Sequence, residues 1–171
     1  MNLELKEGWI WLNGNLIPWQ EAKIHVLSYS LHYGAGVFEG LRSYAIGEGF
    51  AIFRLKDHTK RLLNSAKIVG IEDIKFSQSE LDRAQLEVVQ KNNLKNCYLR
   101  PLIFSGAEAL GLHAKNLSTN VMIAAWEWGS YLGNNSQQQG IRIKVSSFSR
   151  ISSNCAMTKA KATGNYINSV L

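Results

Sequence analysis

Residues Thr158-Lys159-Ala160-Lys161-Ala162-Thr163-Gly164-Asn165-Tyr166 place a lysine among small residues, followed by a glycine and a tyrosine. A lysine becomes a nucleophile when its surroundings lower its pKa and the neutral amine attacks a carbonyl carbon. Small neighbours leave room for a flat ligand beside the chain, and Gly164 permits a close backbone approach. Most lysines are solvated, so this stretch indicates a catalytic lysine only if the rest of the chain supports one.

Composition describes an ordinary globular chain with a basic balance. The 171 residues are 46% hydrophobic and carry a formal charge of +6. This length suits one large domain, or one domain and part of another. The basic residues are scattered and form no tail, zinc-finger or basic-zipper pattern, so we expect no nucleic-acid partner.

The sequence shows no signal peptide, no membrane-spanning run and no cysteines at the spacing of metal ligands. Residues 1–8 lack the apolar core of a signal peptide, and the longest apolar run, Val121–Trp126, is too short to span a bilayer. Cys97 and Cys155 lie far apart without ligand-like spacing, which favours two buried or inert thiols in a reducing compartment. We therefore expect a cytoplasmic protein with no membrane partner.

Two segments read as β-hairpins. In Trp9–Pro18, Asn13-Gly14 supplies the positive φ angles of a tight two-residue turn. Leu41–Arg54 repeats the pattern around Gly47-Glu48-Gly49. The chain is therefore expected to contain a sheet.

Three segments carry helix signals. Residues 28–33 suggest a short helix, and Asp57 is expected to cap a second helix on which Arg61, from spacing alone, lies on the solvated face. A third helix follows Ser77 and Glu80, which form a Ser-x-x-Glu capping box. Its apolar stripe, suited to packing on a sheet, consists of Leu81, Ala84 and Val88.

Residues 22–40 combine rings, histidines and glycines. Tyr33 and Phe38 are large rings beside glycines, which suits either a pocket wall or plain core packing. His25 and His32 have no cluster of other ligands around them, so we expect ordinary hydrogen-bonded histidines and no metal site.

Residues 96–106 read as a strand. Tyr98 and Arg100 are two positions apart and therefore point to the same face. Together they make a good carboxylate receptor, because a guanidinium group matches a carboxylate with two prongs. Pro101 argues for a bulge or an edge position. A further buried strand is expected over Val121–Trp128.

The last forty residues read as a new unit. Residues 131–140 are polar and rich in glycine, which is typical of a linker. Alternation over 141–145 predicts a strand, and Gly164–Leu171 begins a helix. These segments are too few to close a core, so we expect the chain to be the front part of a longer protein.

Seven separated motifs, in this order, closely resemble the branched-chain amino acid aminotransferases, which are class IV pyridoxal-phosphate enzymes. They are Trp-Leu-Asn-Gly (11–14), His-Tyr-Gly (32–34), Val-Phe-Glu-Gly-Leu-Arg (37–42), His-Thr-Lys-Arg-Leu (58–62), Tyr-Leu-Arg-Pro-Leu-Ile-Phe (98–104), Trp-Gly-Ser-Tyr-Leu-Gly (128–133) and Ala-Lys-Ala-Thr-Gly-Asn-Tyr (160–166). The resemblance implies an α+β, D-amino acid aminotransferase-like fold. The resemblance also implies that the chain divides into a small N-terminal α/β domain (1–130), a linker (131–140) and the start of a larger cofactor-binding domain (141–171).

The resemblance also implies roles for single residues. Lys161 matches the lysine that forms the internal aldimine with pyridoxal 5′-phosphate and moves the substrate proton, whereas Lys159 does not match that position. Arg61 matches an arginine that holds the cofactor phosphate, and Tyr166 matches a tyrosine bonded to the phenolic oxygen. The implied substrate residues are Phe38, Tyr98 and Tyr131 around the substrate, Arg100 at the distal carboxylate of glutamate, and Tyr33 and Leu112 reaching in from a partner subunit.

The implied activity is reversible amino transfer from L-leucine, L-isoleucine or L-valine to 2-oxoglutarate, in a homodimer or larger homo-oligomer. Family members continue for roughly another domain. That part carries the acid paired with the pyridine nitrogen, so we expect the 171-residue chain itself to be inactive or nearly so.

Two other interpretations stay open. A D-amino acid aminotransferase or an aminodeoxychorismate lyase shares the lysine, although the Tyr98/Arg100 strand and the Trp-Gly-Ser-Tyr-Leu-Gly segment favour the branched-chain group. A non-catalytic truncated module that binds a partner through an exposed half-interface is the interpretation from a different class.

Overall fold

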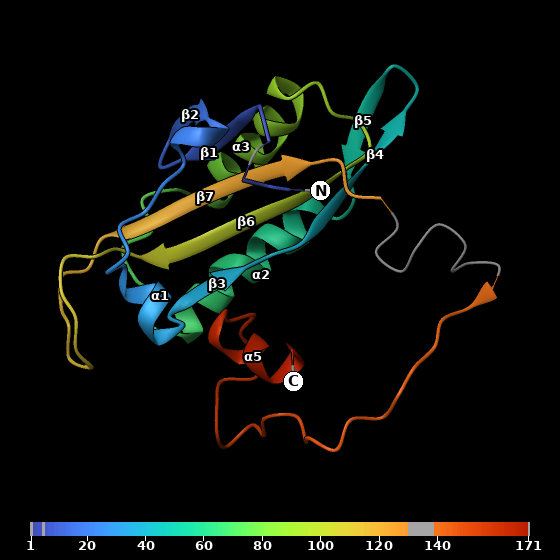
Figure 1. Ribbon diagram of the computed structural model, residues 1–171. Helices are drawn as coiled ribbons and strands as arrows, with labels where there is room; N and C mark the ends of the chain where they lie inside the picture. The colour runs from blue at the N-terminus through green and yellow to red at the C-terminus, as the bar shows by residue number, and fades with distance from the viewer. Residues whose placement is uncertain (1, 5, 130–138, 171) are drawn as a thin grey trace.

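The fold is organised around one antiparallel sheet (Figure 1). The computed structural model describes residues 2–4, 6–129 and 139–170, and within them the sheet has seven strands. They are β1 (Trp9–Leu12), β2 (Asn15–Pro18), β3 (Gly36–Phe38), β4 (Leu41–Ile46), β5 (Gly49–Ile52), β6 (Cys97–Ser105) and β7 (Thr119–Trp126). The order is β2-β1-β7-β6-β4-β5, and β3 pairs with β6 beyond the end of β4.

Two long helices cover one face of this sheet. The helices are η1 (Trp19–Glu21), α1 (Tyr29–Tyr33), α2 (Leu55–Ile68), α3 (Gln78–Lys91), η2 (Gly164–Tyr166) and α5 (Ile167–Val170). Figure 1 shows α2 and α3 behind the strands, and α5 beside β3. Among the described residues, no helix is both long and apolar enough to cross a membrane.

Alternation along β6 separates the two faces of the sheet. Leu99 and Ile103 are fully buried under the helices, in the main core. Tyr98, Arg100 and Leu102 point to the opposite face and are only partly buried. The predicted common face of Tyr98 and Arg100 is therefore confirmed, and it is the face that the long helices leave open.

The predicted turns and the predicted capping box are confirmed. Asn13 and Gly14 have φ angles of 50° and 99°, as the first hairpin requires, and Gly47 has φ 54° in the second. The hydroxyl of Ser77 accepts from the Glu80 N–H, and the Glu80 carboxylate accepts from the Ser77 N–H at 2.8 Å. These features depend on neighbours within a few positions.

The predicted cap of α2 is wrong. Arg54, with φ 50°, stands at the N-cap position, and Asp57 lies inside the first turn. The Asp57 carboxylate instead accepts a hydrogen bond from Arg54 Nε at 2.8 Å. A carboxylate in the first turn still complements the helix dipole, which explains why the sequence signal resembled a cap.

Pro101 lies neither at an edge nor in a bulge of its own strand. β6 is an interior strand that pairs with β7 on one side and with β3 and β4 on the other. The Pro101 carbonyl accepts from the Glu39 N–H at 2.9 Å. Its missing N–H faces the same side, where the link Glu39–Gly40 interrupts the partner strands, so the interior ladder tolerates proline there.

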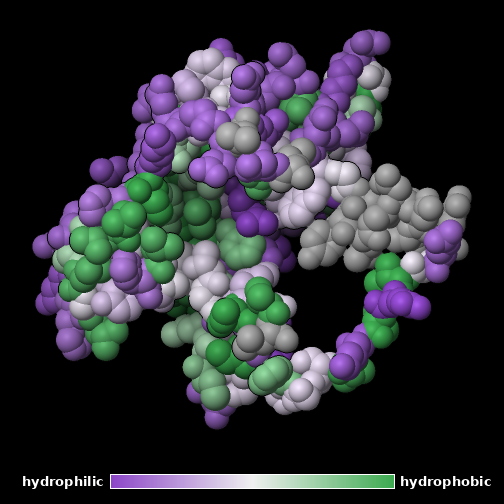
Figure 2. Space-filling view, in the orientation of Figure 1, coloured by the Kyte–Doolittle hydropathy of each residue, from purple (hydrophilic) through white to green (hydrophobic). Residues whose placement is uncertain are grey.

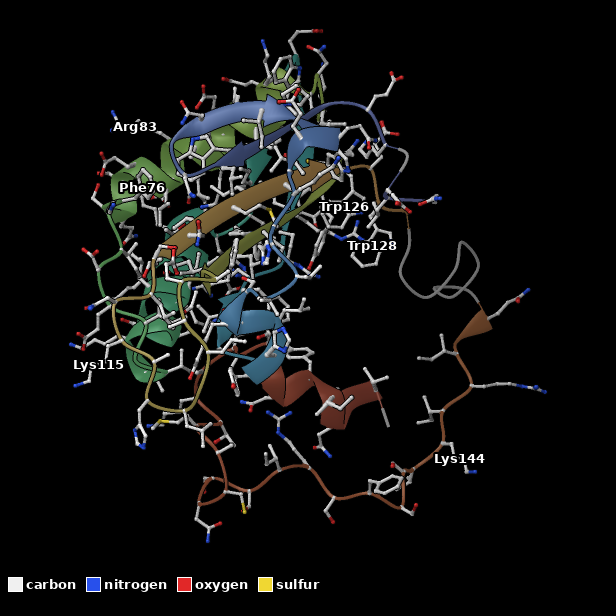
Figure 3. All side chains as sticks on the ribbon, turned by 60° about the vertical axis from the view of Figure 1, so that its left-hand side comes forward. Phe76, Arg83, Lys115, Trp126, Trp128 and Lys144 are labelled. Atoms are coloured by element: carbon white, nitrogen blue, oxygen red, sulfur yellow. The ribbon has the colours of Figure 1, made fainter. Side chains whose placement is uncertain are left out.

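The strand predicted over 141–145 is also absent, because the structure assigns no strand to these residues. They form part of an extended segment that runs outside the sheet (Figure 1), and Ile143 and Val145 are 84% and 90% exposed. Lys144 extends from this segment far from the sheet in Figure 3. Alternation alone does not make a strand, because the backbone groups need a neighbouring strand to pair with.

Both cysteines are expected to be buried or inert, and only one of them is buried. Cys97 lies in β6, where burial raises the pKa of its thiol to about 11, while Cys155 is exposed. At pH 8 we expect iodoacetamide to alkylate Cys155 in the native chain and both cysteines in urea, because the thiolate is the reactive form. Peptide mass mapping reads the outcome, and rapid native labelling of Cys97 would contradict it.

Candidate functional site

The lysine segment pairs with the free edge of β3 through a single β-bridge. Ala162 forms a bridge with Val37. The Phe38 N–H donates to the Lys161 carbonyl at 3.1 Å, and the Thr163 N–H donates to the Gly36 carbonyl at 2.8 Å. Backbone pairing therefore holds residues 161–163 beside the sheet.

Small residues allow this docking. Ala160 and Ala162 are 6% and 8% exposed and belong to the main core. Gly34, with φ +65°, lies so close that a Cβ atom on it would stand 2.7 Å from the Gly164 Cα atom. Their small size therefore serves first to bring the lysine segment against β3; the sequence indicated a close backbone approach at Gly164 but not its partner.

The Lys161 amine lies beside a pair of aromatic rings that contact each other. It donates a hydrogen bond to the Tyr166 hydroxyl. Its nitrogen is 4.6 Å from the Phe38 ring centre and 4.7 Å from the Tyr166 ring centre, and those rings meet edge to face. Lys159 is exposed and makes none of these contacts. The structure thus brings together three of the predicted site residues.

An aromatic hollow of about 800 Å³ opens on one side of this amine, on the open face of the sheet. Arg100 Nη2 donates to the Tyr98 hydroxyl at 2.9 Å, and the Arg100 guanidinium lies 4.6 Å from the Phe38 ring centre. The lining residues are Phe38, Arg42, Tyr98, Arg100, Leu102, Met122, Trp128, Lys161, Thr163 and Tyr166. One wall is therefore apolar and one end carries fixed positive charge.

Sequence reasoning missed Arg42 and Trp128 in this hollow. Arg42 Nη2 donates to the Gly129 carbonyl at 3.1 Å. Trp128 stacks on Trp126 with ring centres 5.7 Å apart, and the two lie side by side near the end of β7 in Figure 3. The Trp-x-Trp spacing at the end of a predicted strand was the available signal, because it puts both rings on one face.

A smaller, polar hollow of about 250 Å³ opens on the other side of Lys161. Its lining residues are Arg61, Arg150, Thr158, Lys159, Ala160, Lys161, Asn165, Tyr166 and Ser169. Two arginines and two lysines give it a positive character suited to an anion. The structure thus places Arg61 next to Lys161, in a hollow separate from that of Arg100.

Glu39 is the buried group beneath this polar hollow, and sequence reasoning gave it no role. Its side chain is fully buried and accepts from Arg61 Nε and from Arg61 Nη2, the latter at 2.7 Å. His58 Nδ1 lies 2.9 Å from the Glu39 carboxylate. Burial alone raises the pKa of Glu39, but the hydrogen bonds from Arg61 and His58 outweigh it and hold the pKa below its usual value.

Tyr33 and Leu112 lie together but apart from Lys161. The Gly111 N–H donates to the Tyr33 hydroxyl at 3.1 Å, which brings the loop carrying Leu112 beside α1. Tyr33 is 43% exposed and Leu112 is 81% exposed, and neither lines the two hollows beside Lys161. Tyr131 lies outside the described residues.

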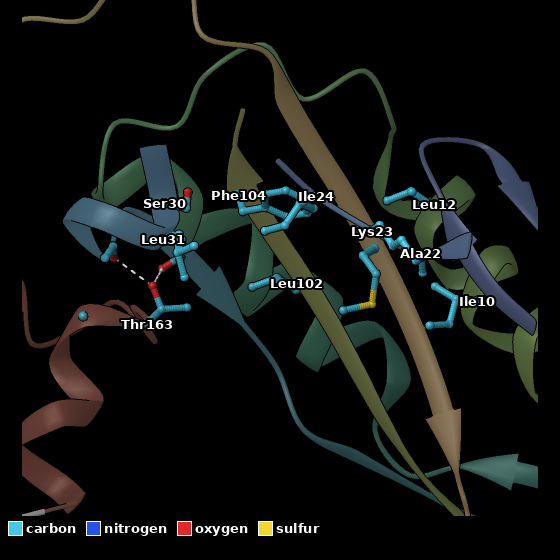
Figure 4. Close-up of a pocket in the computed structure, with 14 residues that line it drawn as sticks. Ile10, Leu12, Ala22, Lys23, Ile24, Ser30, Leu31, Leu102, Phe104 and Thr163 are labelled. Carbon is cyan, nitrogen blue, oxygen red and sulfur yellow. Dashed lines mark hydrogen bonds between the residues drawn. The ribbon is translucent and has the colours of Figure 1, made fainter. Parts of the chain in front are cut away.

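A third hollow, of about 530 Å³, continues along the open face between α1 and β1 (Figure 4). The Thr163 hydroxyl donates toward the carbonyls of Gly34 and Gly36, at 2.8 and 3.2 Å, at one end of it. Nearby apolar surface gathers over the α1 region in Figure 2, where Val26 and Leu31 are exposed. Within the described parts of the chain, no three His, Cys, Asp or Glu side chains group as metal ligands would.

The chain is similar to curated branched-chain-amino-acid aminotransferases. The branched-chain-amino-acid aminotransferase of Pseudomonas aeruginosa is 47% identical over 171 residues, which is 100% of this chain and 55% of that protein. That of Escherichia coli K12 is 46% identical over 167 residues, covering 97% of this chain and 54% of that protein. The chain therefore spans about half the length of the relatives it matches.

Solved structures agree with this fold. The Escherichia coli branched-chain amino acid aminotransferase superposes with a TM-score of 0.93 at 46% identity, over 97% of this chain and 55% of that one. A second branched-chain amino acid aminotransferase, solved with pyridoxamine 5′-phosphate, gives 0.90 at 49% identity, over 96% and 54%. The sequence model of the family described as amino-transferase class IV matches residues 36–171. The chain therefore belongs to the class IV aminotransferase family.

Proposed function

We propose that this chain supplies the catalytic lysine and part of the substrate pocket of a pyridoxal-phosphate-dependent branched-chain aminotransferase. The reaction is reversible transfer of the amino group of L-leucine, L-isoleucine or L-valine to 2-oxoglutarate. One observation carries the proposal. The Lys161 amine, held by Tyr166 and Phe38, stands where a polar cationic hollow meets an aromatic one.

The residues present fit pyridoxal 5′-phosphate. Arg61 and Arg150 offer positive charge to a phosphate in the polar hollow. Lys161 at the border of the two hollows offers an amine to an aldehyde carbon, and the Tyr166 hydroxyl offers a donor to a phenolic oxygen. A similar branched-chain amino acid aminotransferase was solved with N-(5′-phosphopyridoxyl)-L-glutamate, which joins such a cofactor to an amino acid.

The bound cofactor supplies an electron sink for the bonds at the substrate Cα atom. Lys161 Nζ then takes the proton from that Cα atom and returns a proton during the second half of the exchange. The Tyr166 hydroxyl holds the amine in place between transfers. The Phe38 and Tyr166 rings pack against the amine and help to orient it.

Two kinds of side chain must share the aromatic hollow. Rings such as Phe38, Tyr98 and Trp128 accept the branched side chains of leucine, isoleucine and valine. Glutamate brings a distal carboxylate instead, and the paired Arg100 and Tyr98 can receive it. The same wall thus serves both substrates of the exchange.

We propose further that the complete enzyme works in the cytoplasm as a homodimer or larger homo-oligomer. In it, the exposed Tyr33 and Leu112 reach the active site of the partner subunit, and Tyr131 lines the substrate side. Residues 1–130 form a small domain, 131–140 a linker and 141–171 the beginning of a larger domain. Tyr33 and Leu112 are exposed and lie away from Lys161 of their own chain, which supports their proposed place at the active site of a partner subunit.

A half-reaction tests the function. The chain is loaded with pyridoxal 5′-phosphate, and L-leucine, L-glutamate and D-alanine are added separately while absorbance is recorded. We expect L-leucine and L-glutamate, but not D-alanine, to convert the cofactor band near ~400 nm. Conversion is expected to be slow, because the chain spans about half of its relatives. Conversion by D-alanine alone would favour a D-amino acid aminotransferase instead.

A further inference from the structure

We propose that Glu39 is a positioning residue that fixes one edge of the Arg61 guanidinium, so that the other edge receives the phosphate group of the cofactor. This inference rests on the proposed function, which places a phosphate in the polar hollow. It assigns a task to a buried carboxylate that touches neither of the hollows beside Lys161.

The contacts of Glu39 show a carboxylate built into the fold. It follows Phe38 at the link between β3 and β4, and its side chain is fully buried, whereas the Arg61 side chain is 55% exposed. His58 and Arg61 lie three residues apart on one face of α2, and both contact Glu39. The Gly40 N–H also approaches the carboxylate, at 3.3 Å. The anchored partner is therefore Glu39, and Arg61 is the side chain that reaches outward.

The geometry of the guanidinium group gives this anchoring a consequence. A guanidinium presents two edges that can each hold two oxygens. Glu39 occupies the edge formed by Nε and Nη2. Within the part of the chain that the structure describes, no hydrogen bond uses Arg61 Nη1, and Arg61 lines the polar hollow. The edge formed by Nη1 and Nη2 is thus left for an oxyanion.

An electrostatic role and a positioning role of Glu39 predict opposite effects of Glu39→Gln on phosphate binding. A carboxylate near a phosphate repels it, so a purely electrostatic role predicts that Glu39→Gln strengthens phosphate binding. A positioning role predicts weaker binding, because the Arg61 side chain loses a two-pronged anchor and gains rotamer freedom. The sign of the change separates the two roles.

The first experiment uses inorganic phosphate and needs no reaction at Lys161. Thermal unfolding of the 171-residue chain is followed with and without phosphate at matched ionic strength. We expect phosphate to raise the Tm of the unchanged chain and to raise it less in Glu39→Gln and Arg61→Lys. Asp57→Asn is the matched control, because it removes a carboxylate from the other arginine pair on α2, which is exposed and outside the polar hollow.

The second experiment compares pyridoxal 5′-phosphate with pyridoxal, which lacks the phosphate. Each is bound, reduced with borohydride and quantified on Lys161 by mass spectrometry. We expect Glu39→Gln to lower the preference for the phosphorylated form about tenfold, as losing one charge-assisted contact does. A general loss of folding would lower the amount of Lys161 labelled by both ligands together and leave the ratio of the two labels unchanged.

Arg61→Lys keeps the result decisive if Glu39→Gln does not fold. This side chain is more than half exposed and lysine keeps a positive charge beside Glu39, so we expect the variant to fold, but lysine is a point charge and has no second edge. The inference is overturned if either folded variant keeps or strengthens the preference for pyridoxal 5′-phosphate over pyridoxal. It is also overturned if phosphate does not raise the Tm of the unchanged chain. Absence of label on Lys161 with both ligands counts against the proposed function instead, and the phosphate experiment then decides the inference alone.

Discussion

Lys161→Ala is expected to abolish covalent attachment of pyridoxal 5′-phosphate to the chain. Lys161 is the lysine whose amine contacts both Tyr166 and Phe38. Alanine removes the amine that would react with the aldehyde and the base that would move the substrate proton. In the proposed aminotransferase, loss of the base for proton transfer alone would lower the rate by about 10²–10⁴. Borohydride reduction followed by peptide mass mapping reads the attachment directly.

Lys159→Ala is the matched control for this prediction. Lys159 lies two residues earlier, lines the same polar hollow and carries the same charge, but it is exposed and makes none of the ring contacts. We expect its loss to leave the label on Lys161 intact. Equal labelling of the parent and Lys161→Ala would show that any accessible lysine reacts, and the site would then have no special amine.

Gly34→Ala is expected to destabilise the chain by about 3 kcal/mol. A left-handed backbone costs a residue with a Cβ atom about 1–2 kcal/mol, and Gly34 has φ +65°. The new Cβ atom would also stand 2.7 Å from the Gly164 Cα atom, which is backbone and cannot rotate away. Overpacking of this kind adds roughly 1–3 kcal/mol. Urea unfolding measures the total, and the label on Lys161 should fall with it.

Gly70→Ala separates the two contributions. Gly70 also follows a helix and has φ +76°, but an added Cβ atom meets nothing within 4 Å. It should cost only about 1 kcal/mol, from the left-handed conformation alone. Equal losses in the two variants would mean that the contact between Gly34 and Gly164 does not hold the lysine segment in place.

Local features of this protein followed from its sequence. The Asn13-Gly14 turn, the Ser77–Glu80 capping box and the common face of Tyr98 and Arg100 all depend on residues within a few positions of each other. Such short-range preferences act whatever the rest of the chain does. The order of motifs likewise indicated the aminotransferase family, although the roles of single site residues stay predictions.

Tertiary structure decided the features that depend on distant partners. Residues 141–145 alternate like a strand but have no strand beside them, and Pro101 sits in an interior strand because Glu39–Gly40 interrupts its neighbour. Ala162 is small because it packs against the edge of β3. Hydrogen-bond pairing and burial are set by which segments meet, and periodicity within one segment does not contain that information.

Glu39 shows the same division within the site. Its sequence position beside Phe38 was visible, yet nothing local distinguishes it from a solvated carboxylate. Only the approach of α2 to the link between β3 and β4 buries it and supplies His58 and Arg61 as partners. The buried charge of Glu39 is tolerated because folding places His58 and Arg61 within hydrogen-bonding distance of it. The sequence thus determined which residues could do chemistry, and packing between distant segments decided which of them lie together.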